Sequence, residues 1–212
     1  MSHDMADVIH EPVRLATGDG EDLQAEWAIP PDPTAVIVMC HPHPLYGGSM
    51  DAHVVTAVFR ALPRAGVAVL RFNFRGAGSS TGSHGEGRAE RADVVAAIEA
   101  AGARFPGLPL VIGGYSFGAE VALTVDHPSI AAWALVAPPL AIVDAADRVA
   151  LTDPRPKRLI VAAHDQFASP AEVATRTAEA VNTSITEVPG ADHFFAVGLD
   201  TIVAEVTAAV GN

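Results

Sequence analysis

The chain has 212 residues, of which half are hydrophobic and 18% are charged. This length supports one domain with a substantial core, and the composition is unsuited to a disordered or coiled-coil chain. The formal net charge of -12 argues against non-specific binding to nucleic acid or to an anionic membrane, because both need clustered Lys and Arg. We therefore expect a single soluble domain over residues 1–212, with no nucleic-acid and no membrane partner.

Cysteine usage and the start of the chain bear on the compartment. Cys40 is the only cysteine, so no internal disulfide can form, which fits a reducing cytoplasm. The first residues are acidic where a secretory signal needs a basic start followed by an apolar stretch. The longest nearly apolar run, 130–143, contains two prolines and is shorter than the roughly 20 residues that span a bilayer. These features predict a cytoplasmic protein.

Strands and helices alternate along the chain after an initial hairpin. Apolar β-branched runs predict buried strands, and apolar residues at helical spacing predict the helices between them. The predicted strands are 8–15, 21–29, 35–40, 67–74, 108–115, 131–137, 158–163 and 184–188. The predicted helices are 54–62, 88–104, 117 to before 127, a short one at 141–150, 170–181 and 199–210. This order specifies a doubly wound, mostly parallel sheet of about eight strands with helices on both faces.

A serine stands between glycines in 110–120, where a predicted strand meets a predicted helix. In such a nucleophile elbow the serine backbone is strained and the residues two before and two after it must be small, as Gly114 and Gly118 are around Ser116. The helix start would also let the Phe117 amide stabilise an oxyanion. The pentapeptide arises by chance in roughly 5 to 10% of chains this long, so its placement carries the argument. The alternative is a turn whose glycines serve packing alone.

Two further polar residues follow predicted strands in the order that this fold class uses for acyl transfer. Ligands of a doubly wound sheet bind beyond the C-terminal strand ends, where Ser116 is followed along the chain by Asp165 and His193. A serine hydroxyl needs a base to take its proton as it attacks. We predict His193 as that base and Asp165 as the acid that orients it. The alternatives are a capping or surface role for the histidine and Asp144 as the acid.

The loop after the third predicted strand is the expected source of a second oxyanion donor. In His41-Pro42-His43-Pro44 the prolines have no N–H, which leaves the His43 and Leu45 amides, and we favour His43. The prolines would also keep this donor in place before the reaction. His-x-His at a strand end could bind zinc, but no third ligand stands at a recognisable spacing. We expect no metal and no cofactor.

Three other features restrict the function. The glycine-rich segment 76–82 departs from a dinucleotide-binding loop, because its third glycine comes one place late, and it predicts a flexible surface loop. Arg75 could neutralise a substrate carboxylate, but hydrogen bonds to nearby backbone carbonyls are the favoured role. Only about twenty residues separate Ala137 from Lys157, too few for a substantial lid, so we expect an open site for small or exposed esters.

The chain resembles the small, lid-less branch of the α/β-hydrolase superfamily that carries His-Pro-His-Pro after its third strand. The resemblance rests on four motifs, at 41–44 (His-Pro-His-Pro), 72–76 (Phe-Asn-Phe-Arg-Gly), 114–119 (Gly-Tyr-Ser-Phe-Gly-Ala) and 190–195 (Gly-Ala-Asp-His-Phe-Phe). It implies a serine hydrolase with Ser116, Asp165 and His193 as catalytic triad. Dienelactone hydrolases are similar but more distant, and they usually carry cysteine where Ser116 stands.

These features together predict a serine hydrolase that cleaves small carboxylic esters through an acyl-enzyme on Ser116. Thioesterase or peptidase activity on the same fold is the near alternative. A non-catalytic binding module that kept the fold is the alternative from a different class. The small-molecule ester itself is the only partner that the sequence predicts.

Overall fold

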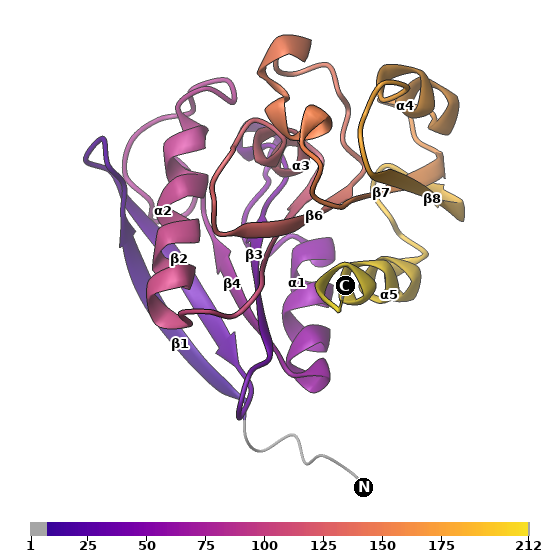
Figure 1. Cartoon of the computed structure of the whole chain (residues 1–212). Coiled ribbons are helices and arrows are strands. Elements are labelled where there is room, and N and C mark those ends of the chain that lie inside the picture. Colours follow the sequence, from indigo (N-terminus) through magenta and orange to yellow (C-terminus); the bar gives the residue numbers. More distant parts are fainter. Residues whose placement is uncertain (1–7, 212) are drawn as a thin grey trace, which may run out of the picture.

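The computed structural model describes residues 8–211. Its centre is an eight-stranded sheet with the order β1-β2-β4-β3-β5-β6-β7-β8 (Figure 1). The strands are β1 (Ile9–Ala16), β2 (Asp22–Ile29), β3 (Ala35–Cys40), β4 (Val67–Phe72), β5 (Leu110–Tyr115), β6 (Ile130–Val136), β7 (Lys157–His164) and β8 (Thr183–Asp192). The α-helices are α1 (His53–Ala61), α2 (Glu90–Arg104), α3 (Phe117–Ala122), α4 (Pro170–Arg176) and α5 (Leu199–Val210).

The sheet is antiparallel only at one edge. The β1–β2 hairpin and the β2–β4 pair run antiparallel, whereas every pair from β4 through β3 to β8 is parallel. Parallel strands end at the same edge of a sheet, so the loops after β3, β5, β7 and β8 meet there. The predicted doubly wound, mostly parallel α/β-hydrolase fold is confirmed.

Helices cover both faces of the sheet, with α2 and α3 on one and α1 and α5 on the other (Figure 1). Strand β3 shows why its sequence is apolar throughout. Val36 and Val38 pack in the core beneath α2 and α3, while Ile37 and Met39 pack in the core beneath α1 and α5. A strand buried on both faces needs apolar residues at every position, because its side chains alternate between the two cores.

Two helices predicted in the middle of the chain differ from the structure. Helix α3 ends at Ala122 rather than before residue 127, and the predicted helix at 141–150 is replaced by 3₁₀ turns at Ala145–Asp147 and Val149–Thr152. The Ala150 amide donates to the Leu123 carbonyl at 3.0 Å, and the Val143 carbonyl accepts the Arg148 guanidinium at 2.7 Å. An α-helix over this segment would pair both groups with its own backbone. Hydrogen bonds to other partners therefore replace local helix formation in this segment.

The C-terminal third differs from the prediction at two further boundaries. Helix α4 ends at Arg176 instead of residue 181. Strand β8 runs through Asp192 instead of ending at Val188, and it stays paired with β7 beyond an irregularity between Ala162 and His164. Because β8 is longer, it carries the chain directly to His193.

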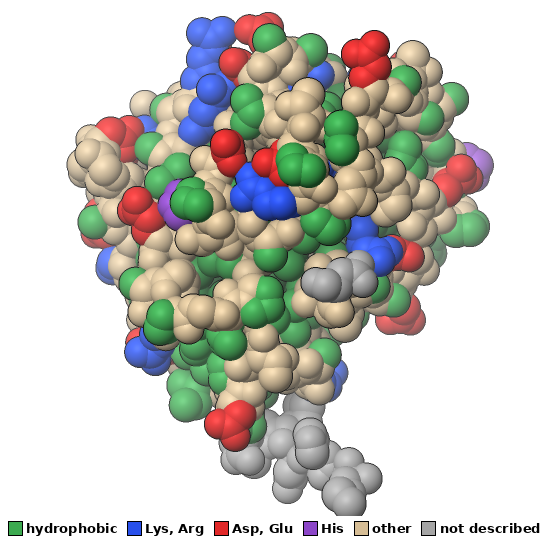
Figure 2. All heavy atoms as spheres, in the orientation of Figure 1, with side chains coloured by type: hydrophobic (Ala, Val, Ile, Leu, Met, Phe, Trp, Pro, Cys, Tyr) green, Lys and Arg blue, Asp and Glu red, His purple; other side chains and the backbone are tan. Residues whose placement is uncertain are grey.

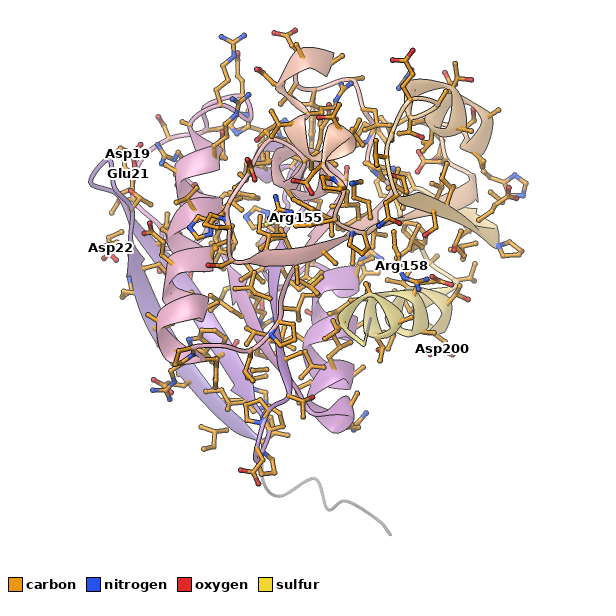
Figure 3. The ribbon with its side chains drawn as sticks, viewed as in Figure 1. Asp19, Glu21, Asp22, Arg155, Arg158 and Asp200 are labelled. Carbon is orange, nitrogen blue, oxygen red and sulfur yellow. The ribbon has the colours of Figure 1, made fainter. Side chains whose placement is uncertain are left out.

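The glycine-rich segment 76–82 is a surface loop, as predicted, and hydrogen bonds connect it to the rest of the chain. Its hydroxyls bond the β2 backbone, since Gln24 N–H donates to Ser80 Oγ at 3.0 Å and Asp22 N–H donates to Thr81 Oγ1 at 2.8 Å. The Arg14 guanidinium also donates to Ser79 Oγ at 3.0 Å. Figure 3 shows Asp22, with Asp19 and Glu21, at the tip of the β1–β2 hairpin. The segment is thus fastened to the hairpin.

The surface agrees with the acidic composition. On the face in Figure 2, Lys and Arg side chains occur in small separate groups with Asp and Glu side chains between them. Among residues 8–211, no helix combines the length and the apolar character that crossing a membrane requires.

Candidate active site

The nucleophile elbow forms between β5 and α3 as a sharp backbone turn. Ser116 has φ of +54° and ψ of -116°, in the left-handed region that side chains disfavour. A Cβ on Gly114 would lie 2.5 Å from the Ala119 nitrogen, and one on Gly118 would collide with the Cys40 carbonyl. Both flanking positions therefore require glycine for steric reasons.

The structure joins the three predicted residues in one hydrogen-bonded chain. Ser116 Oγ lies 2.8 Å from His193 Nε2, and His193 Nδ1 lies 2.8 Å from Asp165 Oδ2. All three side chains are buried or nearly so, which strengthens the electrostatic coupling between them. Asp144 is exposed and lies near Arg88, at 3.5 Å, so it is not the partner of His193.

The Asp165 carboxylate is held by the turn that follows β7. Its Oδ1 atom accepts the Phe167 amide at 2.9 Å and the Ala168 amide at 3.2 Å. These bonds fix the carboxylate plane while both oxygens remain close to the imidazole. When Nδ1–H is directed at this carboxylate, His193 Nε2 carries a lone pair that can accept the hydroxyl proton of Ser116.

Two residues that the sequence analysis did not select hold the backbone of His193. The Tyr115 hydroxyl donates to the His193 carbonyl at 2.8 Å, and the Gln166 side chain accepts the His193 amide at 3.1 Å. Burial raises the pKa of Tyr115, so its phenol stays protonated and able to donate. Only their position in the sequence could have pointed to these two residues, because Tyr115 directly precedes Ser116 and Gln166 directly follows Asp165.

The predicted oxyanion donors lie at the same edge of the sheet, His43 on the loop after β3 and Phe117 at the first position of α3. Neither the His43 amide nor the Phe117 amide donates a hydrogen bond to another residue of the described chain. The competing Leu45 amide donates to His43 Nδ1 at 3.3 Å. The His43 and Phe117 rings are in contact, with centroids 4.9 Å apart, so the His43 loop adjoins the start of α3. The geometry thus favours His43 over Leu45 as the second donor.

The His41 ring is hydrogen-bonded only to backbone groups and serves to hold two loops together. Its Nε2 accepts the Phe74 amide at 3.0 Å, and its Nδ1 lies 2.6 Å from the Pro42 carbonyl, to which it donates. Burial lowers the pKa of His41 to about 4, so the ring is neutral at physiological pH. Both ring nitrogens are engaged, which leaves no lone pair for zinc. The ring connects the start of the His43 loop to the end of β4.

Arg75 is not a carbonyl-binding or substrate-binding residue in this arrangement. Its guanidinium donates to Asp93 at 2.9 Å and to Asp19 at 2.8 Å, and its side chain is almost wholly buried. The favoured prediction of bonds to backbone carbonyls is therefore wrong. Two carboxylates surround the cation, because a buried guanidinium needs opposite charge to offset its lost hydration.

The segment between β6 and β7 stays close to the body of the protein. Arg148 donates to Glu120 at 2.9 Å, and the same carboxylate accepts the amides of residues 141–143. Arg176 donates to the Pro139 carbonyl at 2.6 Å. These contacts hold the chain where a lid could otherwise stand, in agreement with the predicted absence of a substantial lid.

Residues 31–193 match a family model, Hydrolase_4, whose description is serine aminopeptidase, S33. The matched range includes most of the sheet and the hydrogen-bonded residues Ser116, Asp165 and His193. The chain belongs to this family. This Hydrolase_4 member is accordingly a serine hydrolase of the α/β-hydrolase superfamily.

Known proteins similar to this Hydrolase_4 member agree with that assignment. The uncharacterized protein RP471 of Rickettsia prowazekii (strain Madrid E) is 31% identical over 184 residues, which cover 82% of this chain and 77% of that protein. XC6422 of Xanthomonas campestris, an α/β serine hydrolase without a lid, is 28% identical with a TM-score of 0.84, covering 98% of this chain and 95% of its own. An α/β serine hydrolase homologue of Coxiella burnetii is 26% identical with a TM-score of 0.77, covering 94% and 95%.

Proposed function

We propose that this serine hydrolase cleaves small carboxylic esters through an acyl-enzyme on Ser116. The observation that carries the proposal is the hydrogen-bonded chain from Ser116 Oγ through both His193 nitrogens to Asp165, with distances of 2.8 Å at each step. The unengaged amides of His43 and Phe117 beside it provide donors for the developing oxyanion.

In the proposed reaction, His193 Nε2 takes the proton from Ser116 Oγ as the oxygen attacks the ester carbonyl carbon. The carbonyl oxygen becomes an oxyanion that accepts the His43 and Phe117 amides, and the imidazolium is stabilised by Asp165. His193 then gives the proton to the leaving alcohol oxygen as the C–O bond breaks. Water repeats the sequence on the acyl-enzyme and releases the acid. No cofactor takes part in the proposed steps.

Covalent labelling tests the nucleophile. A fluorophosphonate should modify Ser116 in the folded protein, with no labelling of Ser116→Ala and strongly reduced labelling of His193→Ala. Asp144→Asn is the matched control, because this exposed aspartate is not the partner of His193, and it should label as wild type. Absence of labelling in folded wild-type protein would contradict the proposal.

Peptidase activity is the second candidate, because the description of the matched family names a serine aminopeptidase. The same acyl-enzyme chemistry would serve an ester, a thioester or an amide. An ester panel of increasing acyl length, assayed beside matched thioesters and aminoacyl amides, separates these substrates. We expect esters with short acyl groups to give the highest kcat/KM, since the site lacks a lid that could shelter a long chain.

A binding module without turnover is the alternative from another class. It would be favoured by a His193 ring beyond hydrogen-bond reach of Ser116, but the observed separation of 2.8 Å removes that argument. We place the proposed activity in the cytoplasm, where the unpaired Cys40 would remain reduced.

A further inference from the structure

Exposed aromatic side chains are concentrated around the candidate active site. Within residues 8–211, every exposed Phe or Tyr side chain lies on a loop that carries a site residue. Tyr46 is 87% exposed on the His43 loop, Phe167 is 57% exposed after Asp165, and Phe194 is 58% exposed after His193. Exposed apolar groups that gather at one functional edge indicate a binding surface, whereas scattered ones do not.

Phe167 and Phe194 both contact the imidazole of the triad. The ring centroid of Phe167 lies 4.5 Å from that of His193, and the centroid of Phe194 lies 5.7 Å from it. The two phenylalanine rings are 6.4 Å apart and meet edge to face. We call this pair the Phe167–Phe194 wall. Tyr46 instead contacts His43, on the oxyanion side, with centroids 4.8 Å apart.

The chemistry decides which part of an ester meets this wall. His193 must deliver its proton to the oxygen of the leaving alcohol, so that oxygen lies next to Nε2 when the C–O bond breaks. The carbonyl oxygen is meanwhile directed at the His43 and Phe117 amides. A group attached to the leaving oxygen therefore lies beside the side chains that pack on His193.

We propose that the site selects esters of neutral, apolar alcohols, with an aryl-bearing alcohol preferred to a short alkyl one, through contact with the Phe167–Phe194 wall. This inference rests on the proposed esterase function. Aromatic rings gain from offset or edge-to-face contact beyond the area they bury, so an aryl group benefits more than an alkyl group of similar size.

The charges beside the wall exclude an anionic alcohol. Asp165 Oδ1 accepts the Phe167 amide at 2.9 Å, and Asp192 Oδ1 accepts the Phe194 amide at 3.0 Å, so a carboxylate is bonded to the backbone of each wall residue. The guanidinium of Arg75 is paired with Asp19 and Asp93 and is therefore not available to offset a negative substrate. Two carboxylates close to the wall, with no free cation from residues 8–211 beside them, disfavour binding of a carboxylate or phosphate on the leaving group.

Benzyl butyrate and methyl butyrate test the proposal. They share an acyl group, and their alcohols have similar acidity, so the ratio of their kcat/KM values reports recognition of the leaving group. We expect wild type to prefer the benzyl ester by at least about tenfold, and Phe167→Ala to reduce this ratio by about tenfold with a small effect on the methyl ester. The ester of 4-carboxybenzyl alcohol should be cleaved less well than the benzyl ester.

Two controls separate a specific contact from general damage. Tyr46→Ala also truncates an exposed aromatic ring, but on the oxyanion side, and should leave the benzyl-to-methyl ratio unchanged. Val181→Ala truncates an exposed apolar side chain away from the site and should leave both rates unchanged. Benzyl alcohol should also slow fluorophosphonate labelling of wild type more than that of Phe167→Ala.

Three outcomes would overturn the inference. One is equal turnover of benzyl and methyl esters by wild type with normal Ser116 labelling, which leaves the proposed esterase function standing. Another is an equal loss on both esters in Phe167→Ala, which would mean that the ring only shields His193. Finally, preference for the carboxybenzyl ester would contradict the charge argument. Failure of Ser116 labelling and of all ester turnover would reject the esterase function together with this inference.

Discussion

His41 and His193 occupy equivalent places in the sheet but have different partners. Each directly follows a parallel strand, β3 or β8, and each is almost completely buried with both ring nitrogens hydrogen-bonded. His41 bonds only backbone groups, the Phe74 amide and the Pro42 carbonyl. His193 bonds the side chains of Ser116 and Asp165, so it stands between a group that can release a proton and a charge that can stabilise its protonated form.

The difference shows that burial and strand-end position do not by themselves make a histidine a base. A ring between two backbone groups has no partner for a second proton, and its pKa is lowered by burial to about 4. A ring between a hydroxyl and a carboxylate has a proton donor on one side and an anion on the other. The chemistry of the partners therefore assigns a structural role to one histidine and a proposed catalytic role to the other.

The largest expected effect comes from His193→Gln. Loss of the base in the proposed mechanism should lower kcat by about 10⁶-fold, as removal of a triad member does in other serine hydrolases. Circular dichroism and thermal unfolding should show the fold retained. His41→Gln is the matched comparison, and a similar loss of activity in that folded variant would break the distinction between the two histidines.

Asp165→Asn should lower kcat by about 10⁴-fold, because an amide cannot stabilise the imidazolium and favours the wrong tautomer. Its KM should change little, since Asp165 does not face the substrate in the proposed reaction. Steady-state kinetics on one ester measures both constants. Asp144→Asn serves as the control, and a large effect there would reassign the acid.

His41 should make stability depend on pH. The unfolded ring titrates near 6.5 and the folded ring near 4, so between these values the unfolded state binds more protons. The contribution of His41 is thus complete above pH 6.5 and is lost as pH falls toward 4. Protonation of His41 in the unfolded state should therefore lower the free energy of unfolding by about 2 kcal/mol when the pH falls from 7.5 to 5.

Urea unfolding at these two pH values measures this contribution. In His41→Gln the side-chain oxygen can still accept the Phe74 amide but cannot titrate, so its free energy of unfolding should fall by about 2 kcal/mol less than that of wild type over the same interval. Contributions from the other titrating groups are common to both proteins and cancel in the comparison. An equal fall in both would show that His41 is not held neutral by the fold.

Tyr115→Phe should have the smallest of these effects, a decrease in kcat of about tenfold with little change in KM. The variant removes the hydroxyl that donates to the His193 carbonyl, which loosens the position of the base but leaves its partners in place. Thr207→Val is the control. It removes a hydroxyl on α5 that donates a hydrogen bond of 2.7 Å to the Val203 carbonyl, away from the candidate site. If both variants lose activity equally, Tyr115 has no specific positioning role.

Most of the fold was predictable because each strand and most helices carry their own local pattern. The run 35–40 is apolar at every position and became β3, buried on both faces, while the helix at 199–210 has the bounds predicted for it. The errors fall where a distant group replaces local bonding. The Leu123 carbonyl accepts the Ala150 amide, and the Ser80 and Thr81 hydroxyls accept β2 amides, and neither contact is visible in local periodicity.

The candidate site likewise has features that the local sequence predicts and features that depend on tertiary contacts. The elbow around Ser116 was predictable because its requirement is local, a tight turn flanked by residues without side chains. Tyr115, Gln166 and the carboxylate partners of Arg75 were not selected, because their roles depend on which backbone or charge the fold brings within 3.1 Å. Their residue types alone are compatible with many surroundings.

The sequence by itself determined the alternation of elements, the glycine-flanked serine and the chain order of Ser116, Asp165 and His193. Only the tertiary structure decided which histidine lies between a hydroxyl and a carboxylate, which aspartate it meets and where the exposed aromatic rings gather. The physical reason is the separation along the chain over which each interaction acts. Periodicity and steric demands act over a few residues, whereas hydrogen bonds and charge pairs join strand ends that are far apart along the chain and meet only at the edge of the folded sheet.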